Sequence, residues 1–143
     1  MTDRSTAPAR PTTAAIVLAA VIDVVLVLAF VLIGRGSHGE NVVGGALVTF
    51  WPFGAGLVVG WLACAAWRRP QAVWLTGVVV WAAILVVGML LRVVSGQGIA
   101  SSFVVVAAIV LAVFLIGWRA AALLVRRVAS RRRDRAAVAG HRG

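Results

Sequence analysis

Four long apolar stretches dominate the chain, and most polar residues lie between them or at the two ends. The stretches are Ala14–Gly34, Gly44–Ala66, Trp74–Val94 and Phe103–Val125. At about 1.5 Å of helical rise per residue, roughly 20 residues cross a hydrocarbon core about 30 Å thick. The stretches lack the alternation of barrel strands, and only helices or closed barrels satisfy the backbone in lipid. The pattern therefore predicts an all-α polytopic membrane protein with four transmembrane helices.

Short connections join the four stretches, which favours antiparallel packing of successive helices in an up-down bundle. Gly56 and Gly60 stand four residues apart in the second stretch. Small residues at this spacing let the backbones of two membrane helices approach closely. We therefore predict that Gly56 and Gly60 form a helix-packing contact.

The composition agrees with a single membrane domain. Hydrophobic residues make up 62% of the 143 residues and the mean hydropathy is +1.04, too apolar for a soluble domain of this size. The first stretch is longer than the apolar core of a signal peptide and no small-residue cleavage site follows, so we expect it to be retained. The single cysteine, Cys64, excludes an internal disulfide and a thiolate metal cluster. We expect no cofactor and no metal.

Arginine is distributed unevenly about the four stretches, and all fourteen basic residues are Arg. Eleven lie in the terminal segments and the second connection, against two, Arg35 and Arg92, beside the other connections. Arg119, inside the fourth stretch, is left out of this comparison. The positive-inside rule places both termini in the cytoplasm. The use of Arg without Lys, together with the abundance of Ala, Val and Gly, suggests the coding bias of a GC-rich bacterium. We therefore expect a multi-pass protein of a bacterial cytoplasmic membrane.

Three parts follow from this organisation. Residues 1–12 are predicted to be a disordered cytoplasmic tail, residues 13–125 the transmembrane domain, and residues 126–143 a polybasic cytoplasmic tail, disordered from about residue 136. Near a membrane surface each arginine of the basic tail should add roughly 1 kcal/mol of binding to anionic lipid headgroups. These arginines are Arg126, Arg127, Arg131, Arg132, Arg133 and Arg135. No aromatic residues are interleaved with them, so we expect no nucleic-acid partner.

Asp23 is the most informative polar residue, because it lies well inside the first stretch. A carboxylate at such a depth costs about 2.5–3.5 kcal/mol, so it should face the bundle and find a partner. The apolar run Phe103–Trp118 is too short for a span, so its helix either starts earlier, near Ile99, or continues to Val125, which would bury Arg119 at a similar depth. We predict that Asp23 and Arg119 pair, with indole donors available from Trp61 and Trp81. The pair could fix helix packing, Asp23 could relay protons or ions, or the site could hold a lipid or cofactor.

A second polar group is predicted on the outer side, formed by Arg35, His38, Glu40 and Arg92. Arg35 and Arg92 at corresponding helix ends could clamp an anion, since guanidinium groups bind phosphate and carboxylate in a bidentate way. His38 and Glu40 could serve acid–base or metal chemistry, although one imidazole and one carboxylate fall short of a metal site. The alternative is that both arginines reach lipid phosphates and helix C-terminal carbonyls.

A shift of 57 residues aligns the first helical hairpin with the second. The informative matches are Arg35 with Arg92, Gly60-Trp61 with Gly117-Trp118, and Arg69 with Arg126. Both hairpins would start from the cytoplasm, so a duplication would be a parallel repeat about an axis along the membrane normal. Chance similarity in a biased composition is the alternative. Asp23 aligns with Val80, so the intramembrane acid would belong to one half only.

Several segments together resemble a known family. They are DVVLVLAFVLIGRGSHGE (23–40), TFWPFGAGLVVGW (49–61), RRP (68–70), GMLLR (88–92), GQGIASSF (96–103) and FLIGWR (114–119). They resemble the small bacterial and archaeal membrane family catalogued as domain of unknown function 3054, over roughly residues 15–125. The resemblance implies a membrane bundle and carries no activity.

The sequence therefore favours an integral membrane protein that is not an enzyme and acts as an accessory or structural bundle. It contains no nucleophile–base pair and no nucleotide-binding loop. The alternative is a small oligomeric secondary transporter or channel with Asp23 as the coupling carboxylate. The strong arginine bias argues against an antiparallel dimer for such a transporter. An enzyme acting on lipid is a third possibility. Expected partners are membrane lipids and either a second copy or another membrane protein.

Overall fold

The computed structural model describes residues 10–36 and 45–140, apart from the side chains of residues 134 and 136–140. All regular structure in these ranges is helical, and four helical segments are long and apolar enough to cross a membrane. The elements are α1 (Thr13–Gly36), α2 (Ala46–Ala63), η1 (Ala66–Arg68), η2 (Val73–Val78), α3 (Val79–Val94) and α4 (Ser101–Gly140). The predicted all-α class with four spans is therefore confirmed.

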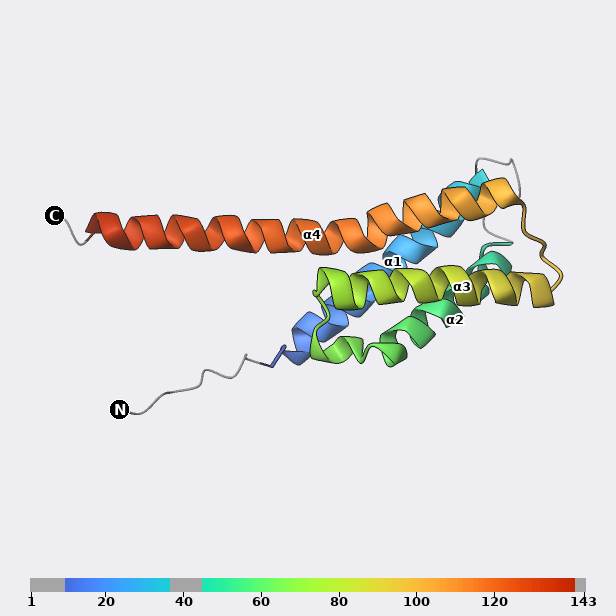
Figure 1. Ribbon diagram of the computed structural model, residues 1–143, viewed down its shortest axis with the longest axis horizontal. Coiled ribbons are helices and arrows are strands. Elements are labelled where there is room, and N and C mark those ends of the chain that lie inside the picture. The colour runs from blue at the N-terminus through green and yellow to red at the C-terminus, as the bar shows by residue number, and fades with distance from the viewer. Residues whose placement is uncertain (1–9, 37–44, 141–143) are drawn as a thin grey trace.

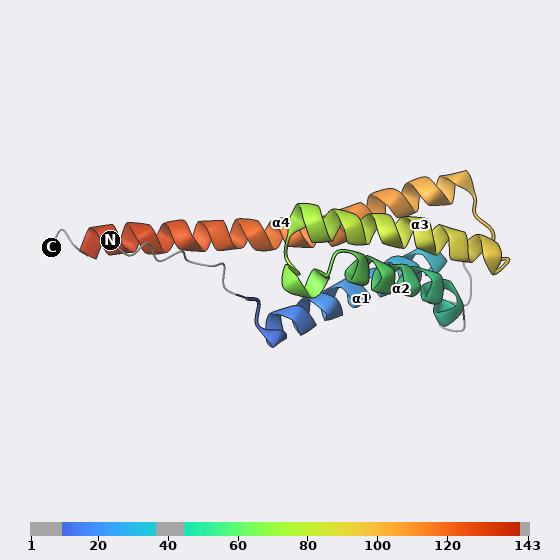
Figure 2. The same ribbon diagram turned by 60° about the horizontal axis from the view of Figure 1, so that its bottom comes forward.

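Successive helices run antiparallel and close into a ring (Figure 1). The helix α1 contacts both α2 and α4, and α3 contacts the same two neighbours. Figures 1 and 2 both show the start of α1 and the C-terminal part of α4 at the same end of the bundle. This arrangement matches the predicted up-down order, whereas the side of the membrane on which the termini lie stays a prediction.

The closest helix pair is α2 with α3, and glycines make it possible. A Cβ atom at Gly56 would lie 2.7 Å from the Cα of Ile84, and one at Gly60 would lie 2.8 Å from the Cα of Val80. Both neighbours are backbone atoms, which cannot move aside cheaply. Gly56 and Gly60 therefore form the predicted packing contact. Gly88 was not predicted as a packing residue; a Cβ atom there would lie 2.8 Å from Cδ1 of the Phe53 ring.

One face of α4 supplies a regular buried stripe to the bundle. Ala107, Leu111, Leu115 and Arg119 follow each other at four-residue spacing and are all fully buried. Three of them contribute apolar side chains to the core, and the fourth brings a guanidinium into it. The helix α4 therefore continues through Arg119, and its buried face carries this residue into the bundle.

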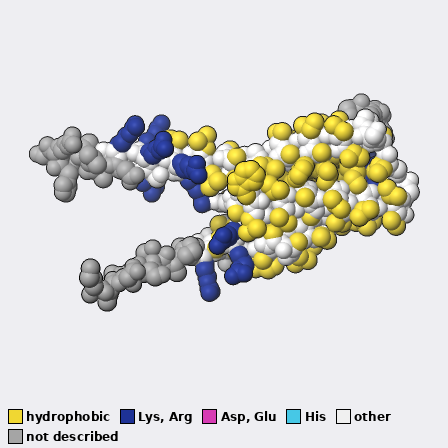
Figure 3. All heavy atoms as spheres, in the orientation of Figure 1, with side chains coloured by type: hydrophobic (Ala, Val, Ile, Leu, Met, Phe, Trp, Pro, Cys, Tyr) yellow, Lys and Arg dark blue, Asp and Glu magenta, His cyan; other side chains and the backbone are white. Residues whose placement is uncertain are grey.

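The helix α4 extends far beyond the bundle, to Gly140 (Figure 1). The predicted disorder is therefore wrong for residues 136–140. Arginine and alanine are strong helix formers, and no Pro or Gly interrupts the segment after Gly117 until Gly140, so the membrane helix propagates into the tail. Residues 1–9 of the predicted N-terminal tail lie outside the described residues. Figure 3 shows apolar side chains covering the bundle and arginines concentrated towards the end from which α4 projects.

Candidate functional site

A fully buried ion pair lies between α1 and α4. Asp23 and Arg119 both have 0% exposed side chains. Nη2 of Arg119 donates to Oδ2 of Asp23 at 2.6 Å, and Nη1 donates to Oδ1 at 2.9 Å. The contact is bidentate, the geometry in which a guanidinium binds a carboxylate most strongly. The structure therefore brings together the two residues that the sequence predicts to pair.

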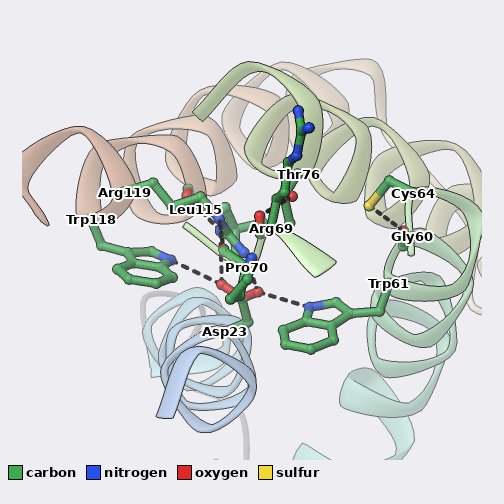
Figure 4. Close-up of polar contacts among 10 residues, drawn as sticks. All are labelled: Asp23, Gly60, Trp61, Cys64, Arg69, Pro70, Thr76, Leu115, Trp118 and Arg119. Carbon is green, nitrogen blue, oxygen red and sulfur yellow. Dashed lines mark hydrogen bonds and ion pairs between the residues drawn. The ribbon is translucent and has the colours of Figure 1, made fainter. Parts of the chain in front are cut away.

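Two tryptophans complete the surroundings of the carboxylate. The indole Nε1 of Trp61, on α2, donates to Oδ2 of Asp23 at 2.9 Å. The indole Nε1 of Trp118, on α4, donates to Oδ1 at 2.9 Å. Figure 4 shows the two rings approaching Asp23 from opposite sides. Each carboxylate oxygen thus accepts two hydrogen bonds, one from an indole and one from the guanidinium.

Arg119 also binds backbone oxygens outside the ion pair. Its Nε donates to the carbonyl of Pro70 at 3.1 Å, and its Nη1 donates to the carbonyl of Leu115 at 2.8 Å. Its Cζ lies 4.7 Å from the ring centroid of Trp118, within cation–π range. Pro70 belongs to the turn between α2 and α3, so Arg119 connects this turn to α1 and α4.

A π-helical turn, η2, lies against the aliphatic part of the Arg119 side chain. In η2 the amide nitrogens of Thr76 and Gly77 both donate to the carbonyl of Ala72, at 3.1 and 3.0 Å. A Cβ atom at Gly77 would lie 3.2 Å from Cδ of Arg119, so a side chain there would crowd the arginine. The hydroxyl of the buried Thr76 donates to the carbonyl of Arg69 at 2.7 Å, which fixes the turn. Single π-helical turns within α-helices are frequent at functional sites.

The chemical consequence of this arrangement is a buried ion pair that joins α1, α2, the turn after α2, and α4. Asp23 comes from α1, Trp61 from α2, Pro70 from the following turn, and Trp118 and Arg119 from α4. Removing one member of a buried ion pair leaves the other charge uncompensated, at a cost of about 3–5 kcal/mol. A bundle in which these two side chains were separated would incur this cost.

The tryptophans at the ion pair differ in part from the sequence prediction. Trp61 donates to Asp23 as expected, whereas Trp81 donates to the carbonyl of Ala108 at 2.9 Å and joins α3 to α4 instead. Trp118 was not predicted as a donor, because a tryptophan near the end of a span is typical of the aromatic belt at the membrane interface. The signal that could have found it is its alignment with Trp61 after the 57-residue shift.

At the other end of the bundle, Arg35 and Arg92 line one cavity of about 590 Å³. Nη1 of Arg35 donates to the hydroxyl of Thr49 at 3.0 Å. Nη1 of Arg92 donates to Oε1 of Gln97 at 3.0 Å, and its Nη2 donates to the carbonyl of Gly98 at 3.3 Å. The structure thus brings together the two arginines of the predicted outer polar group.

The remaining members of that group, His38 and Glu40, lie outside the described residues. Within the part of the chain that the structure describes, no three His, Cys, Asp or Glu side chains come close enough to hold a metal ion.

The arginines predicted to bind lipid headgroups are exposed along α4. Arg126 lines a hollow at the end of the bundle together with Arg10, Arg68 and Arg69. The four arginines from Arg131 to Arg135 stand on the part of α4 that runs on beyond the bundle (Figure 1). The arginines predicted to bind lipid headgroups therefore lie partly at this hollow and partly on the extension of α4.

Comparison with known proteins confirms the family resemblance. The sequence model of the family described as "Protein of unknown function (DUF3054)" matches residues 20–122. This range contains Asp23, Trp61, Trp118 and Arg119, and it ends before the arginines of the α4 extension. No curated protein and no solved structure matches the chain.

Proposed function

The chain belongs to the DUF3054 family, and we propose that it acts as a non-enzymatic structural or accessory bundle of a bacterial cytoplasmic membrane. The role of the Asp23–Arg119 pair in this proposal is to hold four short-looped helices in one arrangement. In each of the four spans, no more than 33% of an 18-residue apolar segment is buried within the bundle. Much of the apolar surface thus remains for lipid, a second copy of the chain or another membrane protein.

The observation that carries the proposal is the saturation of the Asp23 carboxylate. Both oxygens accept an indole and a guanidinium hydrogen, and the side chain is 0% exposed. A coupling carboxylate has to exchange a proton or an ion with water at some stage of a cycle. Here such an exchange would first have to break a bidentate ion pair and two further hydrogen bonds inside the bundle. A packing role requires none of these steps.

Proteoliposomes containing the full-length chain and an internal pH-sensitive dye test this proposal against the transporter alternative. Under an imposed pH gradient, wild-type vesicles should show no proton flux above that of empty vesicles. Asp23→Asn should lower thermal stability, because it leaves Arg119 buried without its counter-charge. Reproducible proton-driven flux in the wild type, lost in an Asp23→Asn protein of unchanged stability, would replace the structural proposal by transport.

A further inference from the structure

Three arginines separate two hollows at the end of the bundle from which α4 projects. Arg10, Arg68 and Arg69 line both a hollow of about 680 Å³ and one of about 500 Å³. The first hollow is completed by apolar groups that include Ile16, Trp67 and Leu75. The second is completed by Leu123, Ala72 and a fourth arginine, Arg126, among others. We call Arg10, Arg68, Arg69 and Arg126 the basic end of the bundle; Figure 3 shows arginines clustered here beside the apolar surface.

The backbone that carries Arg68 and Arg69 is firmly held. The amide nitrogen of Arg68 donates to the carbonyl of Ala65 at 2.8 Å, and that of Arg69 donates to the carbonyl of Ala66 at 3.2 Å. The carbonyl of Arg69 accepts the hydroxyl of buried Thr76 at 2.7 Å. The next residue, Pro70, is itself buried, and its carbonyl accepts a hydrogen bond from Nε of Arg119. The two arginines therefore stand on a preorganised turn, which lowers the entropy cost of binding a ligand.

The positive charge at the basic end has no acidic counterpart among the described side chains. Asp23 is the only carboxylate within residues 10–36 and 45–133, and it is engaged by Arg119. Four arginines from the N-terminal segment, the α2–α3 turn and α4 thus face two hollows without a neighbouring described acid. Such a concentration of guanidinium groups favours phosphate.

The surroundings of these arginines indicate that the phosphate belongs to a lipid. Large apolar side chains continue from the hollows along the bundle and are exposed, among them Val17 at 55%, Leu75 at 49% and Leu124 at 63%. Acyl chains can lie on these side chains while the headgroup stays among the arginines. Basic pockets between membrane helices are known to bind lipids with multiply charged headgroups.

We propose that the basic end binds one anionic phospholipid with two phosphates, of the cardiolipin class, with one phosphate in each hollow. The shared arginines Arg10, Arg68 and Arg69 lie between the phosphates and contact both, while Arg126 adds to the second hollow. Two linked phosphates bind more tightly than two separate ones, because only the first pays the full entropy of association. The proposal does not depend on the proposed structural function.

The more distant arginines of α4 contribute less to this site. The extension follows the long axis of the bundle in Figures 1 and 2. At about 1.5 Å per residue, Arg131 to Arg135 stand roughly 8 to 14 Å farther along the helix than Arg126. The screening length in physiological salt is only about 8 Å. Lipid binding should therefore depend on the bundle end rather than on the tail.

Native mass spectrometry of the full-length protein in detergent tests the proposal with three added lipids: cardiolipin, phosphatidylglycerol and phosphatidylcholine. The wild type should bind one cardiolipin at least about tenfold more tightly than phosphatidylglycerol. Arg68→Gln with Arg69→Gln should weaken cardiolipin binding about thirtyfold, since each arginine near an anionic surface contributes roughly fivefold. The control, Arg132→Gln with Arg133→Gln, removes equal charge from the α4 extension and should change binding less than about twofold. Circular dichroism checks that both variants are folded.

A second pair of variants tests the proposal without altering the α2–α3 turn. It applies if the Arg68→Gln, Arg69→Gln variant does not fold. Arg126 lines a hollow and its neighbour Arg127 does not, so Arg126→Gln should weaken cardiolipin binding more than Arg127→Gln does. Millimolar pyrophosphate distinguishes a lipid from a soluble diphosphate; we expect it to displace no cardiolipin. Equal binding of cardiolipin and phosphatidylglycerol, equal loss in each variant and its control, or displacement by pyrophosphate would overturn the proposal.

Discussion

Trp61 and Trp118 stand 57 residues apart and donate to different oxygens of the same carboxylate, that of Asp23. Two other pairs with the same offset each share one hollow. Arg35 and Arg92 line one cavity, and Arg69 and Arg126 line one hollow at the opposite end. Two residues related by a two-fold axis along the bundle lie close to each other when both are near that axis. These shared sites fit the interpretation that the second hairpin is a parallel repeat of the first, which stays a prediction.

The two indole donors lead to a prediction about stability. Trp61→Phe or Trp118→Phe keeps an aromatic ring but removes one hydrogen bond to a buried carboxylate, which should cost about 1–3 kcal/mol. Thermal unfolding in detergent measures the loss. Trp74→Phe is the control, because Trp74 is 84% exposed, and it should change stability by less than about 0.5 kcal/mol. Equal effects at all three positions would show that the indole hydrogen bonds to Asp23 do not matter.

Glycine substitutions test the α2–α3 contact. Gly56→Ala or Gly60→Ala places a methyl group against the backbone of α3 and should cost about 1–3 kcal/mol through overpacking. Gly117→Ala is the matched control within a membrane helix, since nothing lies within 4 Å of the added Cβ. It should be neutral or raise stability by up to about 1 kcal/mol, because alanine favours the helix. Destabilisation by Gly117→Ala comparable to that of the other two would contradict this packing account.

The arginine distribution predicts the orientation of the bundle. A reporter fused to the C-terminus should be active in the cytoplasm, and one inserted into residues 37–44 should be active on the other side. Alkaline phosphatase and green fluorescent protein fusions report the two compartments. Activity of both fusions in the same compartment would contradict a chain with four spans and cytoplasmic termini.

Physical constraints explain which features could be predicted from the sequence. The span lengths follow from the bilayer thickness, and the pairing of Asp23 with Arg119 follows from the cost of an isolated charge at matching depth. Gly56 and Gly60 were predictable because few other residues permit such close backbones. Trp118 was not, because a tryptophan near the end of a span fits an interfacial belt as well as a buried donor.

Two further features left no clear signal in the residue pattern. Hydrophobic periodicity does not reveal the π turn at Val73–Val78, since the turn is defined by the backbone hydrogen bonds of Thr76 and Gly77 to Ala72. The polar composition of the C-terminal tail was interpreted as disorder beyond about residue 136. An established helix propagates readily through arginine and alanine, and α4 therefore continues to Gly140.

Asp23 and Arg119 are expected to stabilise the bundle as one unit, and a double-mutant cycle measures this directly. Thermal unfolding in detergent compares the wild type with Asp23→Asn, Arg119→Gln and the double variant. Each single substitution leaves a buried polar or charged group without its partner and should cost about 3–5 kcal/mol. The double variant should lose clearly less stability than the sum of the single losses, because neither charge then remains buried alone. Strictly additive losses would contradict the claim.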